Sequence, residues 1–246
     1  METITIENDE EFEIEIVQKN KIPNNSNYTI EDFTQSQAHG LFWDNEIREK
    51  VFGLSSCKND TKKYDICCNE NKFNSLENVS IKTSSNNNID CGDILRFFNG
   101  DFTNKYTIIL IRYTQISDTK VIKEIIELDY TIQLRDYLFG SITEEILTNY
   151  LNTIKSIPHG SVSDDVKKNY KSFKQTLQTT HNMKINISPK VDSKSQRRVQ
   201  CSIPKIDELI EHFPEIVLSR TKNAILRGIQ LTSTIKSGTR KRNKKE

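Results

Sequence analysis

A carboxylate and an ammonium group stand in two short β-prone segments that a polar loop separates. Asp65 lies in Lys63–Cys68 (KYDICC), and Lys82 lies in Asn78–Thr83 (NVSIKT). A hairpin that turns midway between the segments pairs Asp65 with Lys82, and opposed side chains on one face lie only ~5 Å apart at Cβ. Such a pair can serve metal-assisted hydrolysis, or it can be a plain cross-strand salt bridge worth up to about 1 kcal/mol.

The same register decides which residues share a face of the hairpin. It pairs Cys67 with Ser80, and strict alternation then separates a polar face from an apolar one. The polar face is the one available to a cleft, and a slip of one residue would destroy it. The polar face holds Asp65, Cys67, Ser80 and Lys82, and the apolar face holds Ile66, Val79 and Ile81.

KYDI followed by NVSIKTS resembles the core of the PD-(D/E)XK nuclease superfamily, which includes many type II restriction endonucleases. In that family one strand carries an Asp, the next carries (D/E)-x-K, and a preceding helix often adds an acid. The resemblance assigns Asp65 as a metal-ligating carboxylate and Lys82 as the lysine that polarises the attacking water or stabilises the phosphorane. Glu46, in LFWDNEIREKVFG, matches the helix acid and would be the second metal ligand. The implied reaction is hydrolysis of DNA phosphodiester bonds with Mg²⁺.

One position departs from the family pattern. Ser80 stands two residues before Lys82, where the family has Asp or Glu, and a serine cannot supply an anionic ligand. Its hydroxyl can hold a metal-bound water, so Ser80 is an auxiliary candidate. Glu77 is a second auxiliary candidate, although an ideal strand places it on the opposite face unless a bulge intervenes. Catalysis therefore depends on Glu46.

The resemblance covers roughly residues 40–130. DCGDILRFF after the lysine segment and RRVQCSIP near the C-terminus also resemble restriction-type nucleases of large DNA viruses.

A basic segment near residue 195 supplies candidate DNA contacts. Arg and Gln can pair bidentately with guanine and adenine edges, while Lys suits phosphates, although charge runs are ordinarily solvated surfaces. The candidate DNA-binding residues are Lys190, Lys194, Gln196, Arg197, Arg198 and Gln200.

Charge is divided unevenly along the chain. Residues 1–150 hold 15 basic and 26 acidic side chains, a net of −11, and residues 151–246 hold 20 and 8, a net of +12. A basic half favours a polyanionic partner, because each phosphate contact releases counterions. The alternative is that the two halves neutralise each other across an internal interface.

The elements that must position these residues follow from hydrophobic spacing. A helix is expected within residues 29–52, ended by Gly53. Tyr106–Tyr113 (YTIILIRY) predicts a central buried strand. Lys120–Asp129 favours a strand paired with it, and its Ile-rich pattern is also compatible with a helix. Helices are expected from Thr143, over Ser163–Thr180, and from Ile203 to His212.

The predicted fold class is α/β: a mixed central sheet flanked by helices, as in restriction endonucleases, with a mainly helical, basic C-terminal half. The expected divisions are an acidic N-terminal arm (1–28), a nuclease-like core (29–142), a helical DNA-binding part packed on it (143–235) and a basic disordered tail (236–246).

Other classes of protein are disfavoured. No stretch approaches the ~20 apolar residues of a membrane span, and the acidic N-terminus lacks a signal-peptide layout. Five Cys form no CxxC pair, which favours reduced thiols in an intracellular protein over zinc or secreted disulfides.

The sequence therefore predicts a Mg²⁺-dependent, sequence-selective endonuclease that acts on double-stranded DNA. A homodimer is the simplest way to cut both strands of a palindrome. Two alternatives stay open: a noncatalytic DNA-binding protein with a degenerate nuclease site, and a protein-interaction module.

Overall fold

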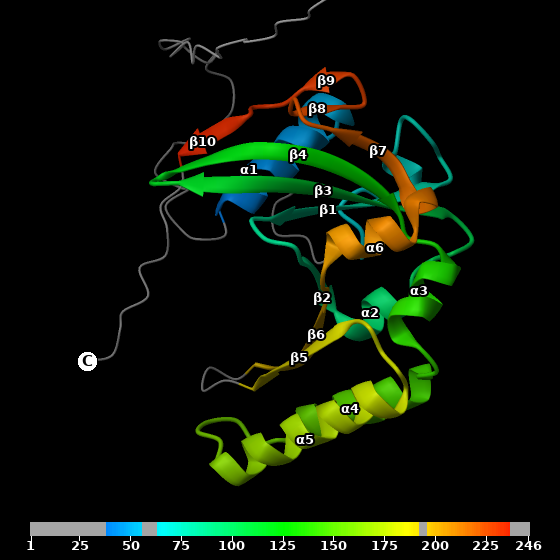
Figure 1. The fold of residues 1–246 in the computed structure, drawn as a ribbon, viewed down its shortest axis with the longest axis vertical. Helices are drawn as coiled ribbons and strands as arrows, with labels where there is room; N and C mark the ends of the chain where they lie inside the picture. Colours follow the sequence, from blue (N-terminus) through cyan, green and yellow to red (C-terminus); the bar gives the residue numbers. More distant parts are fainter. Residues whose placement is uncertain (1–37, 56–62, 192–195, 237–246) are drawn as a thin grey trace, which may run out of the picture.

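The computed structural model describes residues 38–55, 63–191 and 196–236. This part of the chain is a mixed α/β structure built on two sheets (Figure 1). The predicted N-terminal arm and residues 237–246 of the predicted basic tail lie outside the described residues, as do Lys194 and Cys57, whereas Lys236 lies in a strand.

The central sheet is five-stranded and mixed. Its order is β1-β3-β4-β10, and β7 also pairs with β4. The pairing of β1 with β3 is parallel, and the others are antiparallel. β1 is therefore an edge strand. The strands are β1 (Glu77–Ser84), β3 (Lys105–Ile116), β4 (Thr119–Asp129), β7 (Val217–Thr221) and β10 (Thr234–Lys236).

A smaller antiparallel sheet, in the order β2-β6-β5, lies between the central sheet and a pair of helices, α4 and α5 (Figure 1). Its members are β2 (Ile89–Asp93), β6 (Arg197–Ile203) and β5 (Asn186–Val191). A separate short hairpin joins β8 (Ile225–Leu226) to β9 (Ile229–Gln230).

Four of the described helices start at a residue whose side chain caps them. Hydroxyl oxygens of Thr131, Thr143 and Ser163 accept from the third amide of α3, α4 and α5, which satisfies one otherwise unpaired donor in each. Asp93 caps α2 in the same way. The helices are α1 (Ala38–Glu46), α2 (Ile94–Phe98), α3 (Ile132–Phe139), α4 (Glu144–Lys155), α5 (Asp164–Thr180) and α6 (Ile206–His212).

Three shorter helical turns complete the described elements. α1 continues directly into a π-helical turn, which Gly53 follows with a φ of 69°, so the predicted helix end is confirmed. The turns are η2 (Ile47–Val51), η3 (Cys68–Glu70) and η4 (Pro214–Ile216).

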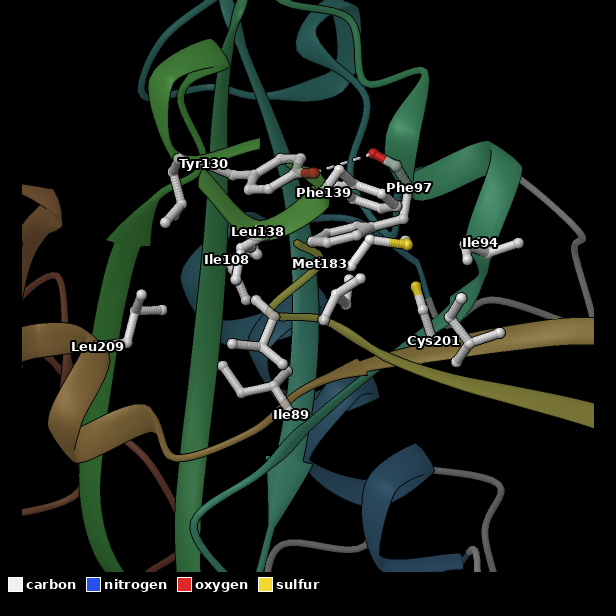
Figure 2. Packing of buried hydrophobic residues seen from close by; sticks show 14 of the residues in the cluster. Ile89, Ile94, Phe97, Ile108, Tyr130, Leu138, Phe139, Met183, Cys201 and Leu209 are labelled. Atoms are coloured by element: carbon white, nitrogen blue, oxygen red, sulfur yellow. Dashed lines mark hydrogen bonds between the residues drawn. The ribbon is translucent and has the colours of Figure 1, made fainter. Parts of the chain in front are cut away.

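Two apolar clusters cover opposite faces of the central sheet. Alternate residues of β3 divide between them: Ile108 and Leu110 face one cluster, and Ile109 and Ile111 face the other. Both faces are therefore buried, as predicted for this strand. Figure 2 shows the larger cluster, where the Tyr130 hydroxyl donates to the Phe97 carbonyl at 3.2 Å.

Part of the predicted fold is confirmed. The structure is α/β with a mixed sheet, and strands lie at Tyr106–Tyr113 and Lys120–Asp129 as expected. The strand predicted at Lys63–Cys68 is wrong, because only Ile66 bridges to β1, through Val79.

The predicted mainly helical C-terminal half is also wrong. Strands β5 and β6 precede α6, and β7 to β10 follow it. The chain after α6 returns to the central sheet, where β7 and β10 pair with β4. These strands are two to five residues long, too short for hydrophobic alternation to mark them.

A buried ion-pair cluster holds the chain that follows α6 against the central sheet. The Arg227 guanidinium donates to both carboxylate oxygens of Glu77 on β1, at 2.7 and 3.0 Å, and to Glu127 on β4 at 2.8 Å. Burial acts to raise the pKa of Glu77, but the bonds from Arg227, Thr107 and Asn71 outweigh it and lower that pKa.

Arg227→Ala is expected to lower the free energy of unfolding by about 3 kcal/mol, because it leaves two buried carboxylates without their cation. Urea denaturation followed by circular dichroism measures the change. The control is Lys167→Ala, which removes an exposed pair with Asp164 and should leave the midpoint almost unchanged. Equal midpoints for both variants would contradict a stabilising role for the cluster.

Candidate functional site

Asp65 and Lys82 lie together at the free edge of β1. The Asp65 carboxylate accepts from the Ile81 amide at 2.6 Å, and the same oxygen lies 3.6 Å from the Lys82 ammonium. Both side chains are partly exposed, at 31% and 28%. The predicted proximity of this pair is confirmed.

The register that produces this proximity differs from the predicted one by two residues. Ile66 bridges to Val79 and not to Ile81. A shift of two residues keeps every side chain on the same face of its strand. Asp65 and Lys82 therefore lie close together although the predicted register is wrong. The next amide along this edge of β1 is that of Ile81. It donates its hydrogen bond to the Asp65 carboxylate and not to the backbone of a neighbouring strand.

Two further charged groups reach this edge from the first helix and its π-helical turn. Asp44 and Arg48 are four residues apart, so they project from the same side of a helix. The buried Arg48 guanidinium donates to the backbone carbonyl of Asp65. This bond ties the helical segment to the chain that carries the carboxylate. π-helical turns of this kind are frequent at functional sites.

Asp44 is the most perturbed carboxyl of this group. Burial, followed by the charge of Asp65, raises the pKa of Asp44 to about 7, although Arg48 and Lys82 act to lower it. Its Oδ1 atom is buried and accepts no hydrogen bond from the residues that the structure describes. The site therefore contains two carboxyl groups that repel each other, one of which has an unused oxygen.

Glu46, the predicted helix acid, has different neighbours. Its carboxylate accepts from the Thr232 amide at 3.0 and 3.1 Å and from the Thr232 hydroxyl at 2.6 Å, and it pairs with Lys50 at 2.6 Å. Two residues along a helix amount to a rotation of about 200°, so Glu46 and Asp44 point to different sides. Glu46 anchors the chain next to β10, and Asp44 is the helix acid beside Asp65.

The two auxiliary candidates are also engaged elsewhere. The Ser80 hydroxyl is buried 3.1 Å from the Tyr106 hydroxyl. Glu77 lies on the other side of β1, within the ion-pair cluster of Arg227, as ideal alternation predicts. Neither side chain forms a hydrogen bond or ion pair with Asp65 or Lys82 in the described structure.

The donor set fits a divalent cation with two protein ligands. Asp44 and Asp65 would hold it, since Mg²⁺ is commonly bound through one or two carboxylates and completes its shell with water. The unused Asp44 oxygen and the repulsion that raises the Asp44 pKa are both relieved by a cation. No group of three or more His, Cys, Asp or Glu side chains with metal-site geometry occurs in the described ranges.

The predicted DNA-binding residues lie on the β5–β6 hairpin. Lys190 and Arg198 are exposed and directly opposite each other, and Gln200 is half-buried on the same face. Gln196 is exposed and immediately precedes β6.

Arg197 has a structural role instead of the predicted one. It is buried, and its guanidinium donates to the carbonyls of Ile157, at 2.9 Å, and of Pro158. Alternation along β6 explains the difference: Arg197 lies on the face with Val199 and Cys201, which packs on α4, and Arg198 lies on the opposite face.

A polar groove lies between the end of β1 and this hairpin. It has a volume of about 310 Å³. One wall is the chain from β1 into β2, and the other is formed by β5 and β6. Its lining residues are Thr83, Ser84, Ser85, Asn86, Asn88, Asp90, Tyr113, Ser188, Lys190, Gln200, Cys201 and Ser202.

Comparison of the chain with protein-family models, curated proteins and solved structures found no significant match. Within the described ranges, no helix has both the length and the apolar character that crossing a bilayer requires.

Asp44→Asn is expected to raise the melting temperature more at about pH 8 than at about pH 5. The folded wild type holds the Asp44 proton more tightly than the unfolded chain, because the pKa is raised to about 7. The stability from that proton is full below the ordinary pKa of 3.8 and is lost as the pH rises through about 7. Asparagine removes this loss. Calorimetry at both pH values measures it, and an equal shift at both would contradict the raised pKa.

Proposed function

We propose that this protein is a Mg²⁺-dependent endodeoxyribonuclease whose site comprises Asp44, Asp65 and Lys82. One observation carries the proposal: a half-buried carboxyl with a buried, unused oxygen, a second carboxylate and a lysine meet at an open strand edge. Two acids and a lysine are the residue types that the PD-(D/E)XK resemblance requires, with Asp44 in the position expected of Glu46. The parallel pair β1–β3 within a mixed sheet supports the restriction-endonuclease-like core.

Each residue has a distinct task in the proposed reaction. Asp44 and Asp65 would hold the cation, which supplies Lewis acidity toward a phosphoryl oxygen when bound. Arg48 fixes the backbone of Asp65, so the carboxylate keeps its orientation without a flanking strand. The Lys82 ammonium is exposed enough to contact a phosphate, where its charge stabilises the developing negative charge.

The surroundings of the site support a nucleic-acid substrate. The exposed Lys190 and Arg198 of the hairpin are suited to phosphates, and Gln200 lines the groove beside the site. The +12 net charge of residues 151–246 adds long-range attraction for a polyanion. Double-stranded DNA is the proposed substrate, and sequence selectivity is part of the proposal.

A second candidate function has its own support. Ser80 occupies the position of the family acid, and its hydroxyl is paired with Tyr106. A site that lacks the strand acid of the family motif is the pattern expected of a noncatalytic DNA-binding protein that keeps the nuclease fold.

The decisive experiment is nicking of supercoiled plasmid DNA with and without Mg²⁺. We expect Mg²⁺-dependent nicking by the wild type. Asp44→Asn, Asp65→Asn and Lys82→Ala should each reduce the rate at least about 100-fold, because each removes a group that acts on the reacting phosphate. Glu46→Gln is the matched acid-to-amide control on the same helix and should stay within about threefold of wild type.

The pattern of loss discriminates between the candidate functions. Salt-sensitive DNA binding without nicking in the wild type would overturn the nuclease proposal and favour the noncatalytic protein. Nicking that is lost with Glu46→Gln but kept with Asp44→Asn would show that the acids are assigned in the wrong order.

Mg²⁺ itself is expected to raise the melting temperature of the wild type, because it binds the folded site and not the unfolded chain. The rise should be larger at about pH 8 than at about pH 5, since binding requires deprotonated Asp44 with its pKa of about 7. Asp44→Asn and Asp65→Asn should abolish the Mg²⁺ effect, while Glu46→Gln should keep it. A rise of equal size in all four proteins would exclude this metal site.

A further inference from the structure

The polar groove between β1 and the β5–β6 hairpin has features of a binding site of its own. It begins at Thr83 and Ser84, the two residues that follow Lys82. A strand of substrate whose phosphate lies at Lys82 would therefore reach the groove with an adjacent nucleotide. This step rests on the proposed function, but the remaining features of the groove do not.

The chemistry of the groove suits a base better than a phosphate backbone. Of its lining residues only Lys190 and Asp90 are charged, and their charges are opposite. A surface that tracks phosphates needs several cations and few anions. Serine, threonine, asparagine and glutamine make up most of the remaining lining, and they offer neutral donors and acceptors of the kind that pair with base edges.

Two side chains of the groove are available for a ligand. The side chains of Gln200 and Lys190 make no hydrogen bond or ion pair with another described residue, whereas the Ser84 hydroxyl donates to Asn86 and Asn88. Residues facing each other across an antiparallel pair share a face, so Ser188, Lys190 and Gln200 lie on one polar face of the hairpin. Neither Lys190 nor Gln200 is needed to hold the hairpin, whose other face packs on the core.

The volume limits what can enter. About 310 Å³ lies at the small end of the range for pockets that enclose a small molecule, and it leaves room for one nucleotide but not for a base pair with its two backbones. The Watson–Crick edge of a base is free to meet neutral donors only when the base is unpaired.

We propose that this groove binds one unpaired nucleotide next to the scissile phosphate, with Gln200 on the base edge and Lys190 on the adjoining phosphate. The substrate class that follows is DNA with an unpaired or extruded base beside the cut, such as a mismatch, a bulge or a single strand. Base extrusion is least costly at such positions.

The test is binding of end-labelled DNA by fluorescence anisotropy in EDTA, so that cleavage plays no part. Three probes are compared: a short oligothymidylate, a perfect duplex, and the same duplex with one unpaired thymidine. We expect the unpaired thymidine to tighten binding relative to the perfect duplex. Gln200→Ala should abolish that gain and weaken the binding of the oligothymidylate about fivefold, which is the effect expected from the loss of one neutral hydrogen bond.

Lys190→Ala should weaken the binding of all three probes. It should also reduce the slope of log K against log salt by the amount expected for about one phosphate contact. Lys105→Ala is the matched control, since Lys105 is an exposed lysine at the opposite end of β3. An oligouridylate of equal length separates DNA from RNA as the source of the nucleotide. Circular dichroism confirms that each variant is folded.

Equal binding of the perfect and the unpaired duplex, or a gain that Gln200→Ala leaves intact, would overturn the groove proposal. These results are independent of the plasmid assay. Nicking without a Gln200-dependent gain in binding would support the proposed function and overturn the groove proposal. A Gln200-dependent gain in binding without nicking would support the groove proposal and overturn the nuclease proposal.

Discussion

The hydrogen bond from the Ile81 amide to the Asp65 carboxylate is the interaction on which the candidate site depends. β1 is an edge strand, and edge amides must find partners or water. The neighbouring chain pairs with β1 only at Ile66 and then leaves. Asp65 satisfies the next amide with its side chain, which holds a carboxylate at the open edge beside Lys82. A longer hairpin would have used that amide for a backbone bond and covered the edge.

Three sets of contacts hold this open edge in position. β3 holds β1 through a parallel ladder, and Arg227 fixes Glu77 at its start. The helical segment behind the edge contributes Asp44 and Arg48, and Arg48 binds the carbonyl of Asp65. This arrangement removes much of the water from Asp44 and places the charge of Asp65 near it, and these two effects raise the pKa of Asp44.

The sequence predicted the parts of this arrangement that arise from strong local patterns. The apolar run at Tyr106–Tyr113 marked the central strand, and the helices expected from Thr143 and over Ser163–Thr180 are α4 and α5. The proximity of Asp65 and Lys82 was also predictable, because a two-residue error of register preserves the faces of a strand.

What the sequence could not decide was set by tertiary contacts. Asp44 and Glu46 are both acids of one helix, and only packing against Thr232 and Arg48 determines which side each faces. The pairing of Glu46 with Lys50 four residues later was the available signal, since such pairs are typical of a stabilising role. The strands after α6 were missed because their stability comes from pairing with β4, and not from their own composition.

The anchoring of the first described helix by Thr232 has a consequence for the order in which the molecule is made. Thr232 binds Glu46 through its amide and hydroxyl and accepts from the Trp43 indole at 3.0 Å, contacts that span 186 and 189 residues of sequence. During synthesis from the N-terminus, Asp65 and Lys82 leave the ribosome long before the residue that fixes the helix bearing Asp44. The nascent chain thus carries an unassembled site until Thr232 has been released, and products truncated before Thr232 lack the contact that completes it.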